Sequence, residues 1–138
     1  MAGRTVTCSI LGEPLAVCRL AAGIAIPDWS MRGGPLASVT TTPDEMSIVC
    51  SESAVPDGVR CERGWRAIKV DGPLDCNETG ILASLAVPLA DANVSLFAVS
   101  TFDTDYLLVK EEALDAARSA LTRAGHTVDP PGSRPIDG

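Results

Sequence analysis

The amino-acid sequence predicts an α+β fold with antiparallel sheets, built as two small units in one chain. Short runs of apolar and β-branched residues are separated by turn residues such as Gly, Pro and Asp. Helical spacing of apolar residues occurs in the stretches 81–92 and 111–124. A strand-and-hairpin pattern occurs twice along the chain, and such a repeat constrains the fold more strongly than local propensity does.

Length and composition exclude several classes of protein. The 138 residues suffice for one ordinary domain or for two very small ones that share a core. The net charge of −7 argues against nucleic-acid binding, because a polyanion-binding surface needs clustered Lys and Arg. No run approaches the roughly 18 apolar residues of a membrane span, and the N-terminus lacks the apolar core of a signal peptide. We therefore expect a cytoplasmic protein with no membrane or nucleic-acid partner.

The cysteines are odd in number, and no two are spaced as Cys-x-x-Cys. With a single histidine, His126, a Cys/His zinc site is not expected, and no metal or redox cofactor is implied. We expect buried, reduced thiols and no disulfide. The cysteines are Cys8, Cys18, Cys50, Cys61 and Cys76. His126 follows the last expected helix, and we interpret it as a surface residue that complements the helix dipole.

The N-terminal half consists mainly of expected strands. They cover residues 5–11, 15–20, 36–42, 46–50 and 59–63. The third and fourth form a hairpin with the turn Thr-Pro-Asp-Glu. The segment between the second and third is broken by Gly and Pro, so Pro27 and Asp28 can open at most one short helical turn, with Trp29 as its apolar anchor.

The C-terminal half begins with a strand at residues 65–70 and continues with a helix. Asp75 and Glu78 fit a capping box, and Asn77 is a competing cap. Pro88 removes one backbone donor, so we expect it to kink this helix. The buried stripe of the helix is expected to be Ile81, Leu82, Leu85, Leu89 and Ala92.

A second hairpin and a second helix complete the expected elements. They cover residues 94–101, 106–109 and 111–124. Asn93 is expected in the left-handed conformation after the first helix, and Gly125 is expected to end the second. The tail 129–138 is rich in Pro and Gly, and we expect it to be disordered.

The two hairpins match each other along the sequence. Residues 39–53 align with residues 99–113 at a constant offset of 60, with valine, threonine, an acidic turn residue and an apolar run in step. The strands before them match at an offset of 50, so the first copy is shorter where its helix should be. We therefore expect two units of ferredoxin-like strand order, a degenerate one at 1–63 and a complete one at 64–128.

The second unit carries a signature that resembles a known family. A helix opening E-x-G-I is followed by P-L-A-D-A-x-V-S and then by V-S-T-F-x-T-D-Y. This pattern resembles the ACT domain and, more narrowly, the paired ACT modules of the CASTOR type, found in small bacterial proteins and in the eukaryotic cytosolic arginine sensor. The resemblance covers about half of the chain, and the N-terminal half fits through the degenerate repeat. It implies a βαββαβ fold, no catalysis, and binding of a free amino acid at an interface between ACT modules.

The resemblance also implies which residues hold the ligand. In the arginine-sensing relatives the ligand lies between the helix start and the strand turn. The positions that match are Glu78, Gly80, Ile81, Thr101, Phe102 and Asp105. Thr79 and Asp103, which lie beside them in the sequence, complete the candidate ligand-binding residues. Where those relatives have an aromatic residue just before the aspartate, this chain has Thr104, so one wall of the side-chain pocket is changed.

These residue types suit an amino acid on chemical grounds. A helix N-terminus offers N–H groups and a positive dipole end to a carboxylate, and Gly80 lets a ligand approach the backbone. Asp103 or Asp105 can accept hydrogen bonds from an ammonium group or from a cationic side chain. Thr101 supplies a hydroxyl and Phe102 an apolar wall.

Simpler roles explain the same residues. Capping alone accounts for Asp75, Asn77 and Glu78, and turn formation alone accounts for Asp103 and Asp105. One alternative is therefore an ACT-fold interaction module that has lost its ligand, pairing with a second copy or with a regulatory protein. An enzyme with a cysteine paired to His126 is a further alternative, but the usual catalytic motifs do not occur in the sequence.

Overall fold

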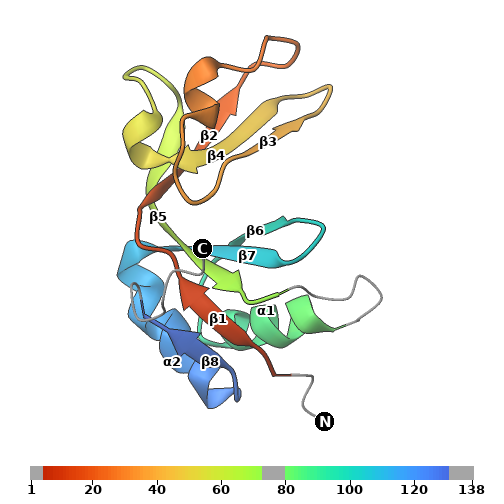
Figure 1. The fold of residues 1–138 in the computed structure, drawn as a ribbon, viewed down its shortest axis with the longest axis vertical. Coiled ribbons are helices and arrows are strands. Elements are labelled where there is room, and N and C mark those ends of the chain that lie inside the picture. The colour runs from red at the N-terminus through yellow and green to blue at the C-terminus, as the bar shows by residue number, and fades with distance from the viewer. Residues whose placement is uncertain (1–4, 73–79, 131–138) are drawn as a thin grey trace. The chain divides into compact units, whose positions relative to one another are not determined.

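The computed structural model describes residues 5–72 and 80–130 of the chain (Figure 1). Its residues group into two compact units, Glu13–Trp65 and the remainder, Met1–Gly12 with Arg66–Gly138. We call Glu13–Trp65 the inserted unit and the remainder the host unit, because the first interrupts the sequence of the second. No helix among the described residues is both long and apolar enough to cross a membrane.

The inserted unit is an antiparallel sheet with very little helix. In chain order it contains β2 (Leu15–Leu20), η1 (Asp28–Met31), β3 (Ser38–Thr41), β4 (Met46–Ser51), η2 (Glu52–Ala54) and the first residues of β5 (Cys61–Val70). The strands lie in the order β3-β4-β2-β5. Short 3-10 segments therefore stand where the ferredoxin-like order places helices, as expected for a degenerate copy. Glycine and proline between β2 and β3 limit η1 to a single turn.

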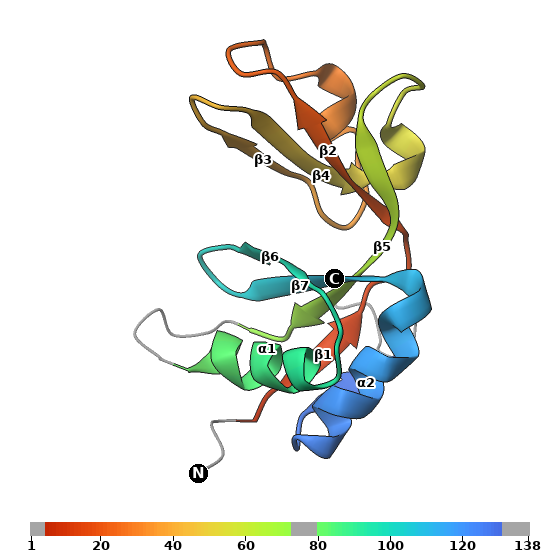
Figure 2. The same cartoon turned by 180° about the vertical axis from the view of Figure 1, so that it is seen from behind.

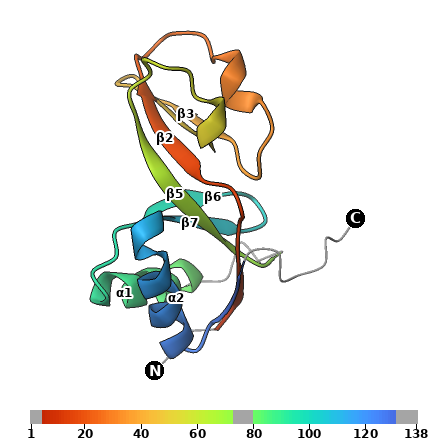
Figure 3. The same ribbon diagram turned by 90° about the vertical axis from the view of Figure 1, so that its left-hand side faces the viewer.

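The host unit has the complete βαββαβ order from β5 onward. After β5 come α1 (Ile81–Asp91), β6 (Phe97–Ser100), β7 (Asp105–Lys110), η3 (Glu111–Ala113), α2 (Leu114–Arg123) and β8 (Thr127–Asp129). The predicted α+β class and ferredoxin-like order are thus confirmed. Figure 3 shows α1 and α2 on one face of the host sheet. Their apolar side chains form its core with the strands, through Ile68, Val70, Ile81, Leu85, Leu89, Leu107, Val109, Ala117 and Leu121.

The first strand, β1 (Thr7–Ile10), belongs to the host unit and not to the unit that follows it in sequence. It pairs antiparallel with β5 and parallel with β8, and its Cys8 and Ile10 side chains lie in the host core. The expected first module at 1–63 therefore differs from the observed inserted unit by the whole of β1. Pairing between strands about 60 residues apart depends on contacts that local sequence patterns do not contain.

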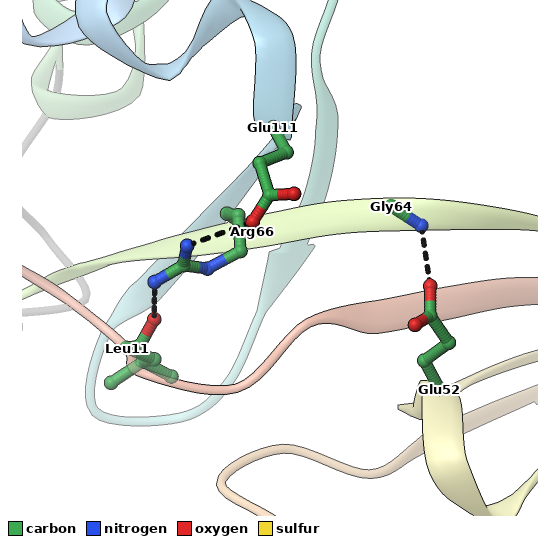
Figure 4. Close-up of polar contacts among 5 residues, drawn as sticks. All are labelled: Leu11, Glu52, Gly64, Arg66 and Glu111. Carbon is green, nitrogen blue, oxygen red and sulfur yellow. Dashed lines mark hydrogen bonds and ion pairs between the residues drawn. The ribbon is translucent and has the colours of Figure 1, made fainter.

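Strand β5 joins two segments that the sequence analysis separates, 59–63 and 65–70. Gly64 has a positive φ of 77°, which explains why the local pattern appears broken there. Figure 4 shows the polar contacts on either side of this point. In the inserted unit, the Gly64 N–H donates to Glu52 Oε1 at 2.8 Å. In the host unit, Arg66 donates to the Leu11 carbonyl at 3.0 Å and to Glu111 Oε1 at 3.2 Å.

Both described α-helices end in the same hydrogen-bonded motif. After α1, Asn93 has a φ of 66° and the Val94 N–H donates to the Leu89 carbonyl at 2.9 Å. After α2, Gly125 has a φ of 99° and the His126 N–H donates to the Leu121 carbonyl at 3.0 Å. These are Schellman caps, and they confirm the left-handed Asn93 and the helix end at Gly125.

His126 is buried, so its interpretation as a surface residue is wrong. It is 4% exposed, its Nδ1 accepts the Val6 N–H at 3.1 Å, and its Nε2 lies 2.9 Å from the Ser84 carbonyl oxygen. Ser84 is four residues before Pro88, which has no N–H to donate to this carbonyl. The proline inside α1 therefore leaves a helix carbonyl free, and the histidine Nε2–H satisfies it.

The register of the two hairpins differs by one residue from the sequence alignment. Thr41 pairs with Met46 in β3–β4, and Ser100 pairs with Asp105 in β6–β7, which sets the offset at 59 and not at 60. At the C-terminus, Asp129 lies in β8 although the expected disordered tail begins there. Residues 131–138 of that tail lie outside the described residues.

Candidate functional site

The candidate site lies at one end of the host unit and involves three segments. They are the end of β5, the start of α1 and the turn between β6 and β7. Figures 1 and 2 show the β6–β7 turn and the first turn of α1 at the same end of the unit. The βαββαβ order causes this arrangement, because the strand before a helix and the following hairpin both turn at the edge where that helix begins.

The start of α1 exposes backbone. Gly80 is the N-cap with a φ of 84°, and within the described ranges nothing lies within 4 Å of a Cβ added to it. The first N–H donated within the helix is that of Ser84, to the Gly80 carbonyl at 2.8 Å. The N–H groups of Ile81, Leu82 and Ala83 have no acceptor within the helix, as at any helix N-terminus. Free N–H groups and the positive end of the helix dipole suit a small anionic group.

Of the four predicted residues at the helix start, the structure describes Gly80 and Ile81. Gly80 is exposed, whereas Ile81 is 5% exposed and its side chain packs in the host core. Ile81 can therefore offer a ligand its backbone N–H but little of its side chain. Glu78 and Thr79 lie outside the described residues, as do the expected caps Asp75 and Asn77.

The β6–β7 turn is closed by threonine hydrogen bonds. The Thr101 N–H donates to the Thr104 carbonyl at 2.8 Å, and the Thr104 N–H donates to Thr101 Oγ1 at 3.2 Å. Thr101 Oγ1 lies 3.1 Å from the Thr104 carbonyl oxygen, to which it donates. The predicted ligand hydroxyl of Thr101 therefore already shapes the turn.

The acidic and aromatic residues at the β6–β7 turn differ in their exposure to solvent and in their hydrogen bonds. Asp105 is half-buried, and its Oδ1 accepts the Ser100 hydroxyl at 2.7 Å. Phe102 is 85% exposed and Asp103 is exposed. Asp105 is thus held in one orientation, while Phe102 presents an aromatic ring at the surface.

Three contacts at this end of the unit were not predicted from the sequence. Ser100 orients Asp105, Thr104 hydrogen-bonds the end of β5, and Asp71 receives the Ser9 hydroxyl on Oδ1 at 3.0 Å. Strand pairing would have indicated Ser100, which stands opposite Asp105 in the hairpin. Nothing in the local sequence indicates the other two contacts, because their partners are 34 and 62 residues away.

Three of the described thiols, those of Cys8, Cys18 and Cys50, are poor nucleophiles. Cys18 stands opposite Cys61 in the β2–β5 pair, and burial, then its neighbours Cys50 and Cys61, raise the pKa of Cys18 to about 12. Burial also raises the pKa of Cys50, and burial with nearby Asp129 raises the pKa of Cys8 to about 11. These thiols stay protonated near neutral pH, which weakens the cysteine–His126 hypothesis together with the two backbone contacts of the His126 ring. The four cysteines that the structure describes are free, and Cys76 lies outside that part.

One further surface hollow contains none of the predicted residues. A hollow of about 440 Å³ lies on the outer face of α2, lined by Asp115, Arg118, Ser119, Thr122 and Arg123. All five come from one helix and include both charge signs, so no set of like groups converges on it. No group of three or more His, Cys, Asp or Glu side chains in the described ranges is placed to hold a metal ion.

Two protein-family models match the chain, one in each half. A model described as an ACT domain matches residues 60–123, and a second model, described as an N-terminal domain, matches residues 13–58. The human protein named cytosolic arginine sensor for mTORC1 subunit 1 is 40% identical over 60 residues, which are 43% of this chain and 18% of that protein. The match therefore spans less than a fifth of the length of that relative.

Solved structures are similar over nearly the whole chain. A protein from Agobacterium tumefaciens is 37% identical with a TM-score of 0.88, covering 98% of this chain and 100% of that chain. The regulatory subunit of aspartate kinase from Thermus thermophilus has a TM-score of 0.59 at 9% identity, covering 83% and 94% of the two chains. At this identity the second likeness concerns the fold alone.

Proposed function

Because the chain belongs to the ACT-domain proteins of the CASTOR type, we propose that it is a non-catalytic regulatory module that binds a free amino acid. The ligand lies between the start of α1 and the β6–β7 turn of the host unit. Its binding is read by a second copy of the chain or by a regulatory protein partner. A cytoplasmic location fits this role, as the name of the human relative states it for that protein.

One observation carries the proposal. An open helix N-terminus and a turn with two aspartates lie at the same end of one unit. An amino acid has a carboxylate and an ammonium group about two bonds apart, so it needs a donor and an acceptor close together. The N–H groups after Gly80 supply the donors, and Asp105 supplies the acceptor.

Asp105 is suited to the ammonium group because its orientation is fixed. One carboxylate oxygen, Oδ1, accepts the Ser100 hydroxyl at 2.7 Å, and within the described ranges this is its one side-chain hydrogen bond. The second oxygen is therefore available for a charge-assisted hydrogen bond. Exposed Asp103 adds negative charge that favours a cationic side chain, while a bare α-amino group would satisfy Asp105 equally well.

The test is a thermal-shift screen of the full chain against the twenty amino acids at millimolar concentration. A ligand at 100 times its Kd adds about 2.7 kcal/mol to the free energy of unfolding. For a chain of this size that raises Tm by about 6–10 °C. We expect such a shift for one amino acid or for a few related ones.

Asp105→Asn keeps the shape of the side chain and removes its charge, so we expect the shift to disappear. Asp44→Asn is the matched control, because Asp44 is an exposed aspartate in the turn of the other hairpin. It should leave the shift unchanged. Flat melting curves with all twenty amino acids would overturn the proposal.

A second candidate function, a ligand-free interaction module, is favoured by the exposed apolar residues. Leu82 and Val87 on α1 are 38% and 56% exposed, in a helix that has no charged residue before Asp91. Phe102 lies at the surface of the same unit. Light scattering after size exclusion, with and without the twenty amino acids, separates the two functions. An oligomer that no amino acid alters favours the interaction module.

A further inference from the structure

One side chain of the β6–β7 turn points inward. Thr101, Phe102 and Asp103 are exposed, whereas Thr104 is 7% exposed. The Thr104 hydroxyl donates a hydrogen bond to the backbone carbonyl of Val70. Burial of a hydroxyl is unfavourable unless it has a partner of this kind, so the contact decides where the side chain lies.

Thr104 is the residue that ties the turn together. Its carbonyl accepts the Thr101 N–H, and its own N–H donates to Thr101 Oγ1. Since its hydroxyl binds Val70, all three polar groups of Thr104 are used. Thr104 therefore fixes the turn relative to β5. Asp105 is the next residue in the chain.

The end of β5 is a fixed point for this contact. Val70 is the last residue of β5 and is fully buried. The next residue, Asp71, donates its N–H to the Thr7 carbonyl at 2.8 Å and receives the Ser9 hydroxyl on Oδ1 at 3.0 Å. In the sequence β5 is the element before α1, so Thr104 connects the turn to the strand that precedes the helix start.

The corresponding residue of the other hairpin makes no such connection with its hydrogen bond. Glu45 occupies the same place in its turn, since its carbonyl accepts the Thr42 N–H at 2.9 Å. Its side chain accepts the Ser47 hydroxyl at 3.1 Å, within the adjoining strand of its own hairpin. The inward contact is therefore a feature of the unit that carries the candidate site, not of the turn type.

We propose that Thr104 is a positioning residue for the amino-acid site, whose hydroxyl holds the β6–β7 turn against the end of β5. The inference rests on the proposed function. Thr104 touches no ligand itself. It sets the position of Thr101 and Asp105 before the ligand arrives, and preorganisation of this kind increases affinity because less order is lost on binding.

The first test needs no ligand. Thr104→Val keeps the shape of the side chain and removes the hydroxyl, Thr104→Ser restores it, and Thr122→Val changes an exposed threonine of α2 as a control. In amide hydrogen exchange, we expect the amides of residues 101 and 104 to exchange about three- to tenfold faster in Thr104→Val. The amide of Leu107, in the core of the same hairpin, should change less than these two. Equal acceleration at all three positions would mean a general loss of stability and would overturn the positioning role.

The second test measures binding of the amino acid that gives the largest shift in the thermal screen, by isothermal titration. We expect the Kd to rise about three- to tenfold in Thr104→Val and to stay within twofold of wild type in Thr104→Ser and Thr122→Val. An unchanged Kd in Thr104→Val overturns this inference and leaves the proposed function intact. If the wild-type chain binds none of the twenty amino acids, the proposed function and the positioning role both fall.

Discussion

The two hairpins have the same hydrogen-bonded turn but differ in the helical segments that accompany them. In the inserted unit the Glu45 N–H donates to Thr42 Oγ1 at 3.1 Å, and in the host unit the Thr104 N–H donates to Thr101 Oγ1 at 3.2 Å. Short 3-10 segments accompany the first hairpin, whereas α-helices accompany the second. Among the described residues, the host hairpin therefore shares its edge with an α-helix start, whereas the inserted hairpin does not. An α-helix start at the same edge supplies the backbone donors that a carboxylate requires.

The largest expected effect comes from weakening the packing of α1, the helix that distinguishes the host unit from the inserted unit. Leu85 of α1 is fully buried, so Leu85→Ala should lower the free energy of unfolding by about 2–5 kcal/mol through lost burial and a cavity. Leu82 is 38% exposed in the same helix, and Leu82→Ala should cost below about 1 kcal/mol. Urea unfolding monitored by circular dichroism measures both. Equal costs at the two positions would contradict the observed packing of α1.

The next effect concerns the contact between His126 and α1. His126→Phe keeps the ring shape but leaves the Val6 N–H and the Ser84 carbonyl without their partners, each worth about 1–3 kcal/mol when buried. In the Pro88→Ala background, residue 88 supplies an N–H to Ser84, so the cost of His126→Phe should fall by about 1 kcal/mol. A double-mutant cycle in urea measures this coupling. Additive costs would mean that the histidine does not compensate for the proline.

A smaller effect tests whether the two turns are equivalent. Thr42→Val and Thr101→Val each keep the side-chain shape and remove the hydroxyl that closes the turn. Each should lower the free energy of unfolding by about 0.5–1.5 kcal/mol, as for one ordinary hydrogen bond. Thr101→Val should also weaken amino-acid binding, whereas Thr42→Val should not. Unequal losses in urea unfolding would show that the two threonine hydroxyls contribute differently to stability although their hydrogen bonds have the same geometry.

The last effect is the response of the buried thiols to alkaline pH, which is smallest near neutrality. Thiols of the unfolded chain titrate near pH 9.0, whereas burial raises the pKa of Cys18 to about 12 and that of Cys8 to about 11. Well below pH 9 both states hold their protons, so stability should change little through the thiols between pH 7 and 8.5. Above pH 9 the unfolded state loses protons first, and stability should fall toward pH 12. Urea unfolding at pH 7, 8.5 and 10.5 checks this, and Cys18→Ala should reduce the alkaline loss.

Local sequence patterns predicted much of the fold. The strand at Leu15–Leu20 is as expected, and Asn93 and Gly125 end their helices as expected, because turn and cap residues act over a few positions. What they missed depends on distant partners. The pairing of β1 with β5 and the burial of His126 against Ser84 join segments far apart in sequence. The one-residue error in the hairpin offset arose because similar residues stand on either side of the true register.

The candidate site was predictable to a smaller extent. Residue type and family resemblance indicated Gly80, Thr101 and Asp105 as candidates. The sequence did not indicate which neighbouring side chains hold them in position. Ser100 and Thr104, which hold Asp105 and the turn, are short hydroxyl residues of a kind that is common in any loop. Their roles follow from burial and hydrogen bonding, which only the folded chain determines.

The path of the chain through β1 and β5 has a consequence for how such proteins diversify. β1 and β5 are antiparallel neighbours, with Ile10 opposite Ile68 and the Leu11 N–H donating to the Ala67 carbonyl at 2.9 Å. The inserted unit thus occupies the place of a hairpin loop, and it also begins and ends on paired strands, with Leu15 opposite Trp65. Segments with adjoining ends can be exchanged or deleted as a cassette with little entropic cost. Replacement of residues 13–65 by a two-residue turn should therefore leave a chain that still forms the host fold.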